Sequence, residues 1–218
     1  MDRLRQSPAS RYVGRVTFPQ TYWIAVPLIL ASASQIRQTM LDQAGIAHMA
    51  IAPDVDEAAI KARHDDPGHA AIELAGAKAL AVSGGYPGAW VIGSDSMVTV
   101  GGRSFDKPAS REEAADHLRV FSGKSMILTS TVALARDGSV DWAEADQATL
   151  KVRPLSEAFI QSYLDADWPS VGQCVGVFRL EGPGVQLFDS INGDHFTVLG
   201  MPLLPLLNAL RQRGLVPS

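Results

Sequence analysis

Six charged residues that lie far apart in the sequence are of the types that bind and hydrolyse phosphate compounds. Three are cations and three are carboxylates: Arg37, Lys78 and Lys107, with Glu57, Asp95 and Glu181. Three cations can neutralise a polyphosphate, while carboxylates hold a divalent metal and orient water. Singly, each is more simply a solvated side chain or, for Glu57, an acid in the first turn of a helix. The set therefore predicts a phosphate site only if the fold brings its members together.

Asp95 is the most informative of these residues by its position. It interrupts the apolar run "AWVIGSDSMVTV" (89–100), which is typical of a buried strand. An ionised carboxylate there costs several kcal/mol unless a metal, a cation or hydrogen-bond donors compensate. Two readings stay open: a polar residue at the end of the strand, or a general base or Mg²⁺ ligand with Ser94 and Ser96 as neighbouring donors.

Arg37 occupies an unusual position in the stretch "LILASASQIRQTML" (28–41). An apolar strand leads into a serine-rich turn, where Ser34 can cap a helix by accepting from its first N–H groups. The helix dipole disfavours a cation in that first turn by roughly 0.3–1 kcal/mol unless an anion lies nearby. The pattern of strand, turn, helix and arginine therefore predicts an anion site.

Composition narrows the classes of function. The 218 residues carry a formal net charge of −4, which argues against broad electrostatic binding to nucleic acid. The single cysteine, Cys174, excludes an internal disulfide and a multi-cysteine zinc site, and the five histidines show no i, i+4 pair. Any metal is thus expected to be a hard cation held by carboxylates.

Periodicity and turn residues predict an α/β protein with a mixed sheet. Residues 1–26 carry no apolar stretch typical of a signal or membrane span, and we expect a flexible extension and a cytoplasmic protein. Strands are expected at 28–30, 46–52, 89–100, 126–135 and 145–152, and helices at 34–44, 56–63, 67–83, 110–121, 156–167 and 203–213. The segment 175–202 is glycine-rich and strand-like.

The motifs resemble, in order and spacing, those of the Maf family of nucleotide pyrophosphatases. The matching segments are "LILASASQIRQTML", "APDVDE", "LAGAKA", "VIGSDSMV", "DKP", "FSGK" and "EGPG…NGDHFTVLGMP". The resemblance implies one catalytic domain over 27–216, with a mixed sheet, flanking helices and a deep cleft between two lobes. It implies hydrolysis of nucleoside triphosphates between the α and β phosphates, with Mg²⁺ or Mn²⁺.

Residue by residue, the resemblance makes Asp95 the proton acceptor. It places Ser34, Arg37, Glu57, Lys78, Lys107 and Glu181 at the substrate, with Asp95 and Glu57 as candidate metal ligands. With an uncharged Ile36 together with Glu181, this sequence resembles the branch of the family that hydrolyses 7-methyl-GTP. Members often form dimers, so the resemblance also implies pairing of two copies.

Two other functions remain open from the sequence. One is a catalytically weak nucleotide-binding regulator of cell division and septum formation. The other is a Mg²⁺-dependent phosphatase that releases orthophosphate, although the sequence offers no P-loop signature in its favour. Neither nucleic acid nor a membrane is an expected partner.

Overall fold

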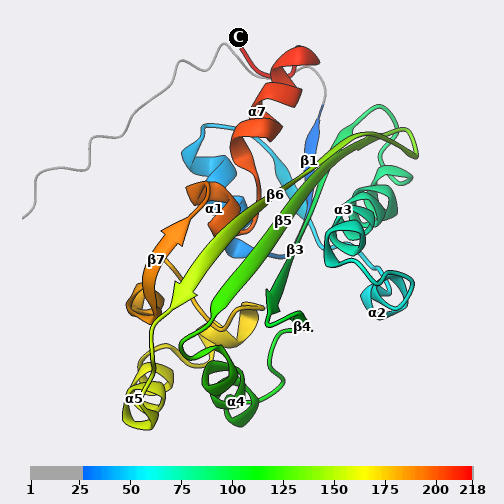
Figure 1. Ribbon diagram of the computed structural model, residues 1–218. Helices are drawn as coiled ribbons and strands as arrows, with labels where there is room; N and C mark the ends of the chain where they lie inside the picture. The colour runs from blue at the N-terminus through cyan, green and yellow to red at the C-terminus, as the bar shows by residue number, and fades with distance from the viewer. Residues whose placement is uncertain (1–26, 218) are drawn as a thin grey trace, which may run out of the picture.

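A computed structural model describes residues 27–217, which form an α/β fold built on one mixed sheet (Figure 1). The strands are β1 (Leu28–Ala31), β2 (Met49–Ile51), β3 (Trp90–Val100), β4 (Arg103–Phe105), β5 (Ser125–Arg136), β6 (Ser139–Val152) and β7 (Phe188–Asn192). Their order is β2-β1-β3-β5-β6-β7, with β4 paired to β3. β1 is parallel to β2 and β3, and the other pairs are antiparallel. The predicted fold class is confirmed.

Seven α-helices among residues 27–217 flank this sheet. They are α1 (Gln35–Gln43), α2 (Glu57–Lys61), α3 (Pro67–Ser83), α4 (Arg111–Phe121), α5 (Glu157–Asp167), α6 (His195–Leu199) and α7 (Leu203–Gln212). The flexible extension predicted for residues 1–26 lies outside the described residues. No helix within 27–217 combines the length and the apolar character needed to cross a membrane.

Side chains of β1 and β3 alternate between two helical layers, as the period of a strand requires. Leu28, Leu30 and Ile92 pack with α1 and α7, whereas Ile29 and Val91 pack against α3. Further along the sheet, β3, β5 and β6 carry a separate cluster that α4 and α5 cover. Figure 1 shows these long strands running from one group of helices to the other. The sheet thus joins two lobes, each with its own core.

Local signals located most elements correctly. Ser110 caps α4 by accepting from the Glu113 N–H at 3.1 Å, and Gly45 follows α1 with a φ of 72°. The prediction for 175–202 was largely wrong, because only Phe188–Asn192 is a strand there. The short 3₁₀ helices η2 (Ser170–Gln173) and η3 (Pro183–Leu187) and α6 occupy much of the region around it. Glycine and proline in "EGPG" favour tight turns over a regular ladder.

Candidate active site

A cleft of about 360 Å³ opens beside β3, where the two lobes meet. All seven residues predicted for the site line it: Ser34, Arg37, Glu57, Lys78, Asp95, Lys107 and Glu181. The volume falls within the roughly 300–1,000 Å³ typical of small-molecule sites. The fold therefore brings the set together, and the role of each residue remains a prediction.

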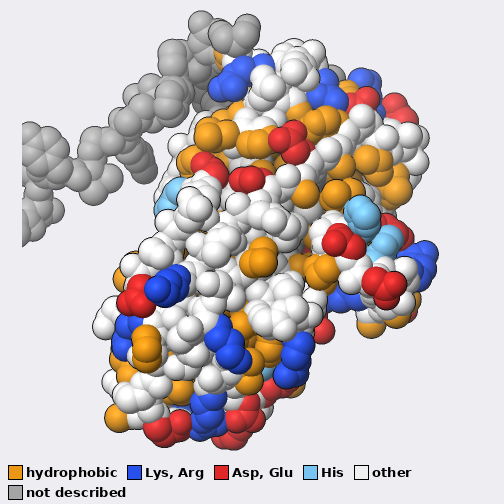
Figure 2. Space-filling view, viewed as in Figure 1, with side chains coloured by type: hydrophobic (Ala, Val, Ile, Leu, Met, Phe, Trp, Pro, Cys, Tyr) orange, Lys and Arg blue, Asp and Glu red, His pale blue; other side chains and the backbone are white. Residues whose placement is uncertain are grey.

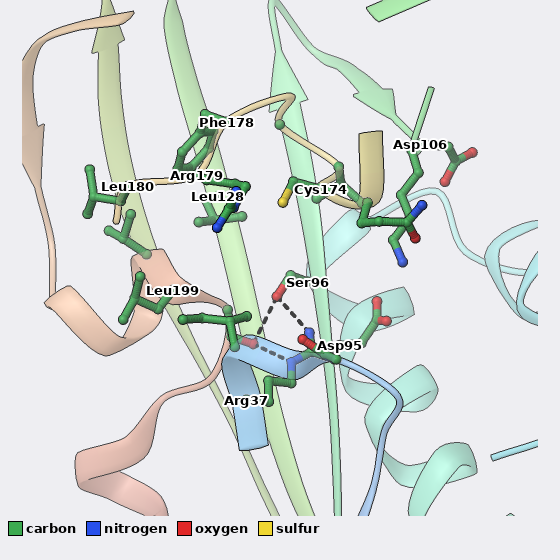
Figure 3. Close-up of a pocket in the computed structure, with 18 of the residues that line it drawn as sticks. Arg37, Asp95, Ser96, Asp106, Leu128, Cys174, Phe178, Arg179, Leu180 and Leu199 are labelled. Carbon is green, nitrogen blue, oxygen red and sulfur yellow. Dashed lines mark hydrogen bonds between the residues drawn. The ribbon is translucent and has the colours of Figure 1, made fainter. Parts of the chain in front are cut away.

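A gap in the sheet edge creates the opening. β1 pairs with β3 only over residues 90–93, and β4 pairs with it only from Val98 onward. Between them, residues 94–97 of β3 have a partner on the β5 side alone. Because neighbouring side chains of a strand point to opposite faces, Asp95 and Ser96 reach the same cleft from two sides. Figure 3 shows both residues close to Arg37.

Lys78 compensates the buried charge of Asp95, which answers the question that the sequence raised. Its Nζ lies 2.6 Å from Asp95 Oδ1 and 2.7 Å from Glu57 Oε1. Lys78 and Asp95 are 8% and 7% exposed, whereas the Glu57 side chain is 46% exposed. One ammonium group thus bridges a buried and a half-exposed carboxylate, which are the two candidate metal ligands.

The three lysines of the cleft lower the pKa of Glu57. Burial alone would raise the pKa of this carboxyl group. The hydrogen bond and charge of Lys78, with the charges of Lys61 and Lys107, outweigh burial and lower the pKa below 4.5. Glu57 is therefore ionised near neutral pH, and three lysines lie close enough to affect its titration.

Close packing of α3 on β3 positions Lys78. Gly93 leaves no room for a side chain, since a Cβ there would lie 2.0 Å from the carbonyl oxygen of Ala75 in α3. The Thr131 hydroxyl of β5 donates to the Ala71 carbonyl of the same helix at 2.8 Å. The helix is thereby held both along the sheet and toward it.

Arg37 makes three hydrogen bonds within the protein. Nε donates to the Gly200 carbonyl at 2.9 Å, Nη1 to the Ser94 carbonyl at 2.9 Å, and Nη2 to Ser96 Oγ at 3.0 Å. Burial lowers its pKa, and the charges of Asp95 and Glu57 oppose that shift. Arg37 therefore joins α1, β3 and the turn after α6, with N–H groups left for a phosphate.

Ser34 departs from the role that helix capping suggested. It is the N-cap residue of α1, but its side chain accepts no hydrogen bond from the helix. Its own backbone N–H instead donates to Ser32 Oγ at 3.1 Å. The hydroxyl of Ser32 thus accepts the hydrogen bond in this turn, and Ser34 lines the cleft.

Several apolar side chains gather on one side of the cleft, where Arg179 lies beside them. Phe178, Leu180 and Leu199 gather across the cleft from Asp106, with Ser96 between them (Figure 3). Glu181 also lines the cleft, and its Oε1 accepts from Arg179 Nε at 3.4 Å. A flat aromatic group fits beside these apolar side chains, and a polyanion fits the opposite side.

Sequence reasoning missed several residues that line the cleft. Lys61 lies one helical turn after Glu57, and its Nζ donates to Asp106 Oδ1 at 2.5 Å. The i, i+4 spacing with Glu57 was a signal for Lys61. Cys174 also lines the cleft, and burial, aided by the charge of Glu181, raises its pKa to about 11. Its thiol is accordingly a poor nucleophile near neutral pH.

Charged side chains occur both on the outer surface and in the cleft. Figure 2 shows acidic and basic side chains interspersed over the end of the molecule that α4 and α5 form. The cleft itself is lined by five cations and four carboxylates: Arg37, Lys61, Lys78, Lys107 and Arg179, with Glu57, Asp95, Asp106 and Glu181. Because the cations outnumber the carboxylates only by one, the protein alone would leave a bound polyanion partly unneutralised.

Comparison with known proteins gives a consistent result. The family model described as Maf-like protein matches residues 27–213. A nucleoside triphosphate pyrophosphatase of Rhodopseudomonas palustris is 45% identical over 199 residues, covering 90% of this chain and 98% of its own. One of the same name from Sphingopyxis alaskensis is 45% identical, with 88% and 99% covered. A 7-methyl-GTP pyrophosphatase of Rhizobium etli is 43% identical over 193 residues, with 87% and 97% covered.

Proposed function

The chain belongs to the family of Maf-like proteins, and on that premise we propose that it hydrolyses nucleoside triphosphates to a monophosphate and pyrophosphate. The observation that carries this proposal is the convergence on one cleft of residues spread from Ser34 to Glu181. Relatives with more than 40% identity and nearly complete coverage bear the name of this activity. The bond cleaved is taken to be the one between the α and β phosphates.

Asp95 is the group best placed to accept a proton from the attacking water. Its carboxylate faces the cleft on a rigid strand, and Lys78 holds its orientation at 2.6 Å. A phosphate that draws Lys78 toward itself would free the Asp95 carboxylate to accept a proton when substrate is present. Arg37 and Lys107 add positive charge where the transition state gains negative charge.

A divalent cation fits this site as an auxiliary to the substrate. Glu57 and Asp95 both lie within 2.7 Å of one nitrogen, so their oxygens are close neighbours. No group of three or more potential ligands of the His, Cys, Asp or Glu type occurs among residues 27–217. Mg²⁺ usually takes one or two carboxylates and completes its shell with water and phosphate oxygens. When bound, it would supply charge neutralisation for the phosphates.

The apolar side of the cleft is proposed to hold the base. A purine methylated at N7 carries positive charge, and Glu181 would complement it beside the uncharged Ile36. The competing cation is Arg179, whose Nη1 is held 2.9 Å from Asp167 Oδ1. This arrangement favours a 7-methyl-GTP-like substrate over an uncharged pyrimidine.

One assay tests both activity and base. Common and N7-methylated nucleoside triphosphates are each incubated with Mg²⁺ or Mn²⁺, and pyrophosphate and orthophosphate are measured separately. We expect pyrophosphate as the first product and its loss in Asp95→Asn, with nucleotide binding kept within a few-fold. Asp141→Asn, which neutralises an exposed carboxylate outside the cleft, is the matched control. Orthophosphate as first product, or full activity in Asp95→Asn, would refute the proposal.

A further inference from the structure

Lys61 is a cation of the cleft to which neither the motifs nor the resemblance assigns a role. Three of the five lysines of the chain line this cleft, namely Lys61, Lys78 and Lys107. Lys61 comes from α2, one turn after Glu57, and the intervening Ile60 is buried and anchors the short helix. Residues at i and i+4 share a helix face, so Lys61 and Glu57 both face the cleft.

The partner of Lys61 belongs to a different part of the cleft wall. Asp106 follows β4, and its carboxylate accepts from Lys61 Nζ at 2.5 Å. The side chain of Asp106 is 76% exposed and that of Lys61 is 27% exposed. Exposed ion pairs contribute little to stability, since water screens them and ordering long side chains is unfavourable. A ligand with a higher charge density can therefore take Lys61 from Asp106.

Three of the other four cations of the cleft are held by more buried partners or by several hydrogen bonds. Lys78 bridges Glu57 and Asp95, and Arg37 makes three hydrogen bonds to protein atoms. Arg179 is paired with the buried carboxylate of Asp167. Lys61 is the paired cation whose partner is the most exposed, so it can turn to a ligand at the lowest cost.

We propose that Lys61 binds the distal phosphates of the substrate, the part that leaves as pyrophosphate, and that it gives up its ion pair with Asp106 to do so. The direction follows from the two sides of the cleft. With the base beside Leu180 and Leu199, the phosphate chain extends past Asp95 toward Asp106 (Figure 3). The proposal rests on the proposed function for the identity of the substrate.

The first experiment separates the two halves of the substrate. Lys61→Met is compared with the wild type and with Lys151→Met, which removes an exposed lysine of β6 outside the cleft. Losing one charge-assisted hydrogen bond should raise KM roughly 10- to 100-fold. Product inhibition by pyrophosphate should weaken by a similar factor, whereas inhibition by the nucleoside monophosphate should stay within twofold. Unchanged inhibition by pyrophosphate would overturn the proposal.

A second variant distinguishes a Lys61 that binds substrate from a Lys61 that only stabilises the cleft wall through its ion pair. Asp106→Asn removes the charge of the partner but keeps Lys61, so KM should fall or stay the same. If the pair merely tied two parts of the wall together, Asp106→Asn and Lys61→Met would raise KM alike. That result would also overturn the proposal, and thermal denaturation of both variants checks that each is folded.

Direct binding keeps this test independent of turnover. Titration calorimetry of the full-length protein with inorganic pyrophosphate should give a Kd roughly tenfold or more higher for Lys61→Met than for the wild type. If Lys61→Met weakens pyrophosphate binding but the wild type cleaves no nucleotide, the proposed function is refuted and the role of Lys61 in binding pyrophosphate is supported. Equal Kd values would refute the role of Lys61 whatever the activity.

Discussion

Replacing Gly93 with alanine tests how strongly activity depends on the close packing of α3 against β3. A Cβ at this position would lie 2.0 Å from the Ala75 carbonyl oxygen and 2.8 Å from the Ala79 backbone nitrogen. Real Cβ atoms essentially never approach another heavy atom closer than 3.0 Å. Because both contacts are backbone atoms, no side-chain rotation relieves them, and the helix must move by about 1 Å.

The shift has two measurable consequences. Overpacking a core typically destabilises a protein by about 1–3 kcal/mol, which lowers Tm by roughly 5 °C for a chain of this size. Lys78 directly precedes Ala79 and would move away from Asp95 with the helix. A misplacement of about 1 Å can cost roughly 100-fold in rate, so kcat/KM should fall by about that factor.

The assay is pyrophosphate release at a temperature well below the Tm of the variant, with Tm from calorimetry. Gly84→Ala is the matched control: Gly84 ends the same helix at a φ of −64°, and a Cβ there meets nothing within 4 Å. We expect it to leave kcat/KM within twofold and Tm within about 1 °C. A Gly93→Ala protein with the Tm and kcat/KM of the wild type would show that the helix need not lie so close.

Three further outcomes follow from the charges of the cleft. Lys78→Met leaves Asp95 buried without a cation, so we expect a loss of about 3–5 kcal/mol in calorimetry and no pyrophosphate release; near-normal stability would contradict this. The thiol of Cys174, the only cysteine, has its pKa raised to about 11 from 9.0, so mass spectrometry should show alkylation at pH 8 about 100-fold slower than for a free thiol, and slower still with nucleotide bound. The pKa of Glu57 is lowered from 4.5 in the folded protein, so its ion pair with Lys78 stabilises the protein above pH 4.5, and this stabilisation is lost as the pH falls through the lowered pKa. The difference in Tm between the wild type and Glu57→Gln should therefore shrink on acidification. A difference that stays constant with pH would refute this.

The sequence predicted those parts of the fold whose signals are local. The cap of Ser110, the turn at Gly45 and the periodicity of α7 each lie within a few residues of the element they define. The segment 175–202 was misjudged because its glycines and prolines permit several backbone paths, and contacts from elsewhere select one. Propensity alone does not carry that information.

The site was predicted as a set of residues but without its partners. Asp95 needs a compensating cation on general grounds, yet nothing in the strand shows that the cation is Lys78. The pair of Lys61 and Asp106 joins residues 45 positions apart, and Arg37 bonds Gly200 across 163 positions. Such pairings depend on the tertiary fold, so one sequence without coordinates gives the residue types and leaves the geometry open.

The buried hydroxyl groups around Asp95 explain how a cleft between two lobes can hold a fixed geometry. On one face of the strands, Ser94 and Ser130 donate to the carbonyls of Gly200 and Thr197, at 3.2 and 2.8 Å. On the other face, the Thr131 hydroxyl donates to the Ala71 carbonyl of α3. Apolar contacts alone would let packed layers slide, because they have no direction. Hydrogen bonds in a dry interior are directional and costly to break.

These bonds act where the apolar clusters of the two lobes stop. The β3 residues of one cluster end at Ile92 and those of the other begin at Val98, so the stretch that carries Asp95 lies between two cores. Helices on both faces are tied to it through the hydroxyls of its own and the adjacent strand. The carboxylate is thereby fixed relative to Lys78 on one side and to Arg37 on the other. Substrate-driven movement is then left to the exposed groups of the wall, of which Lys61 and Asp106 are the clearest pair.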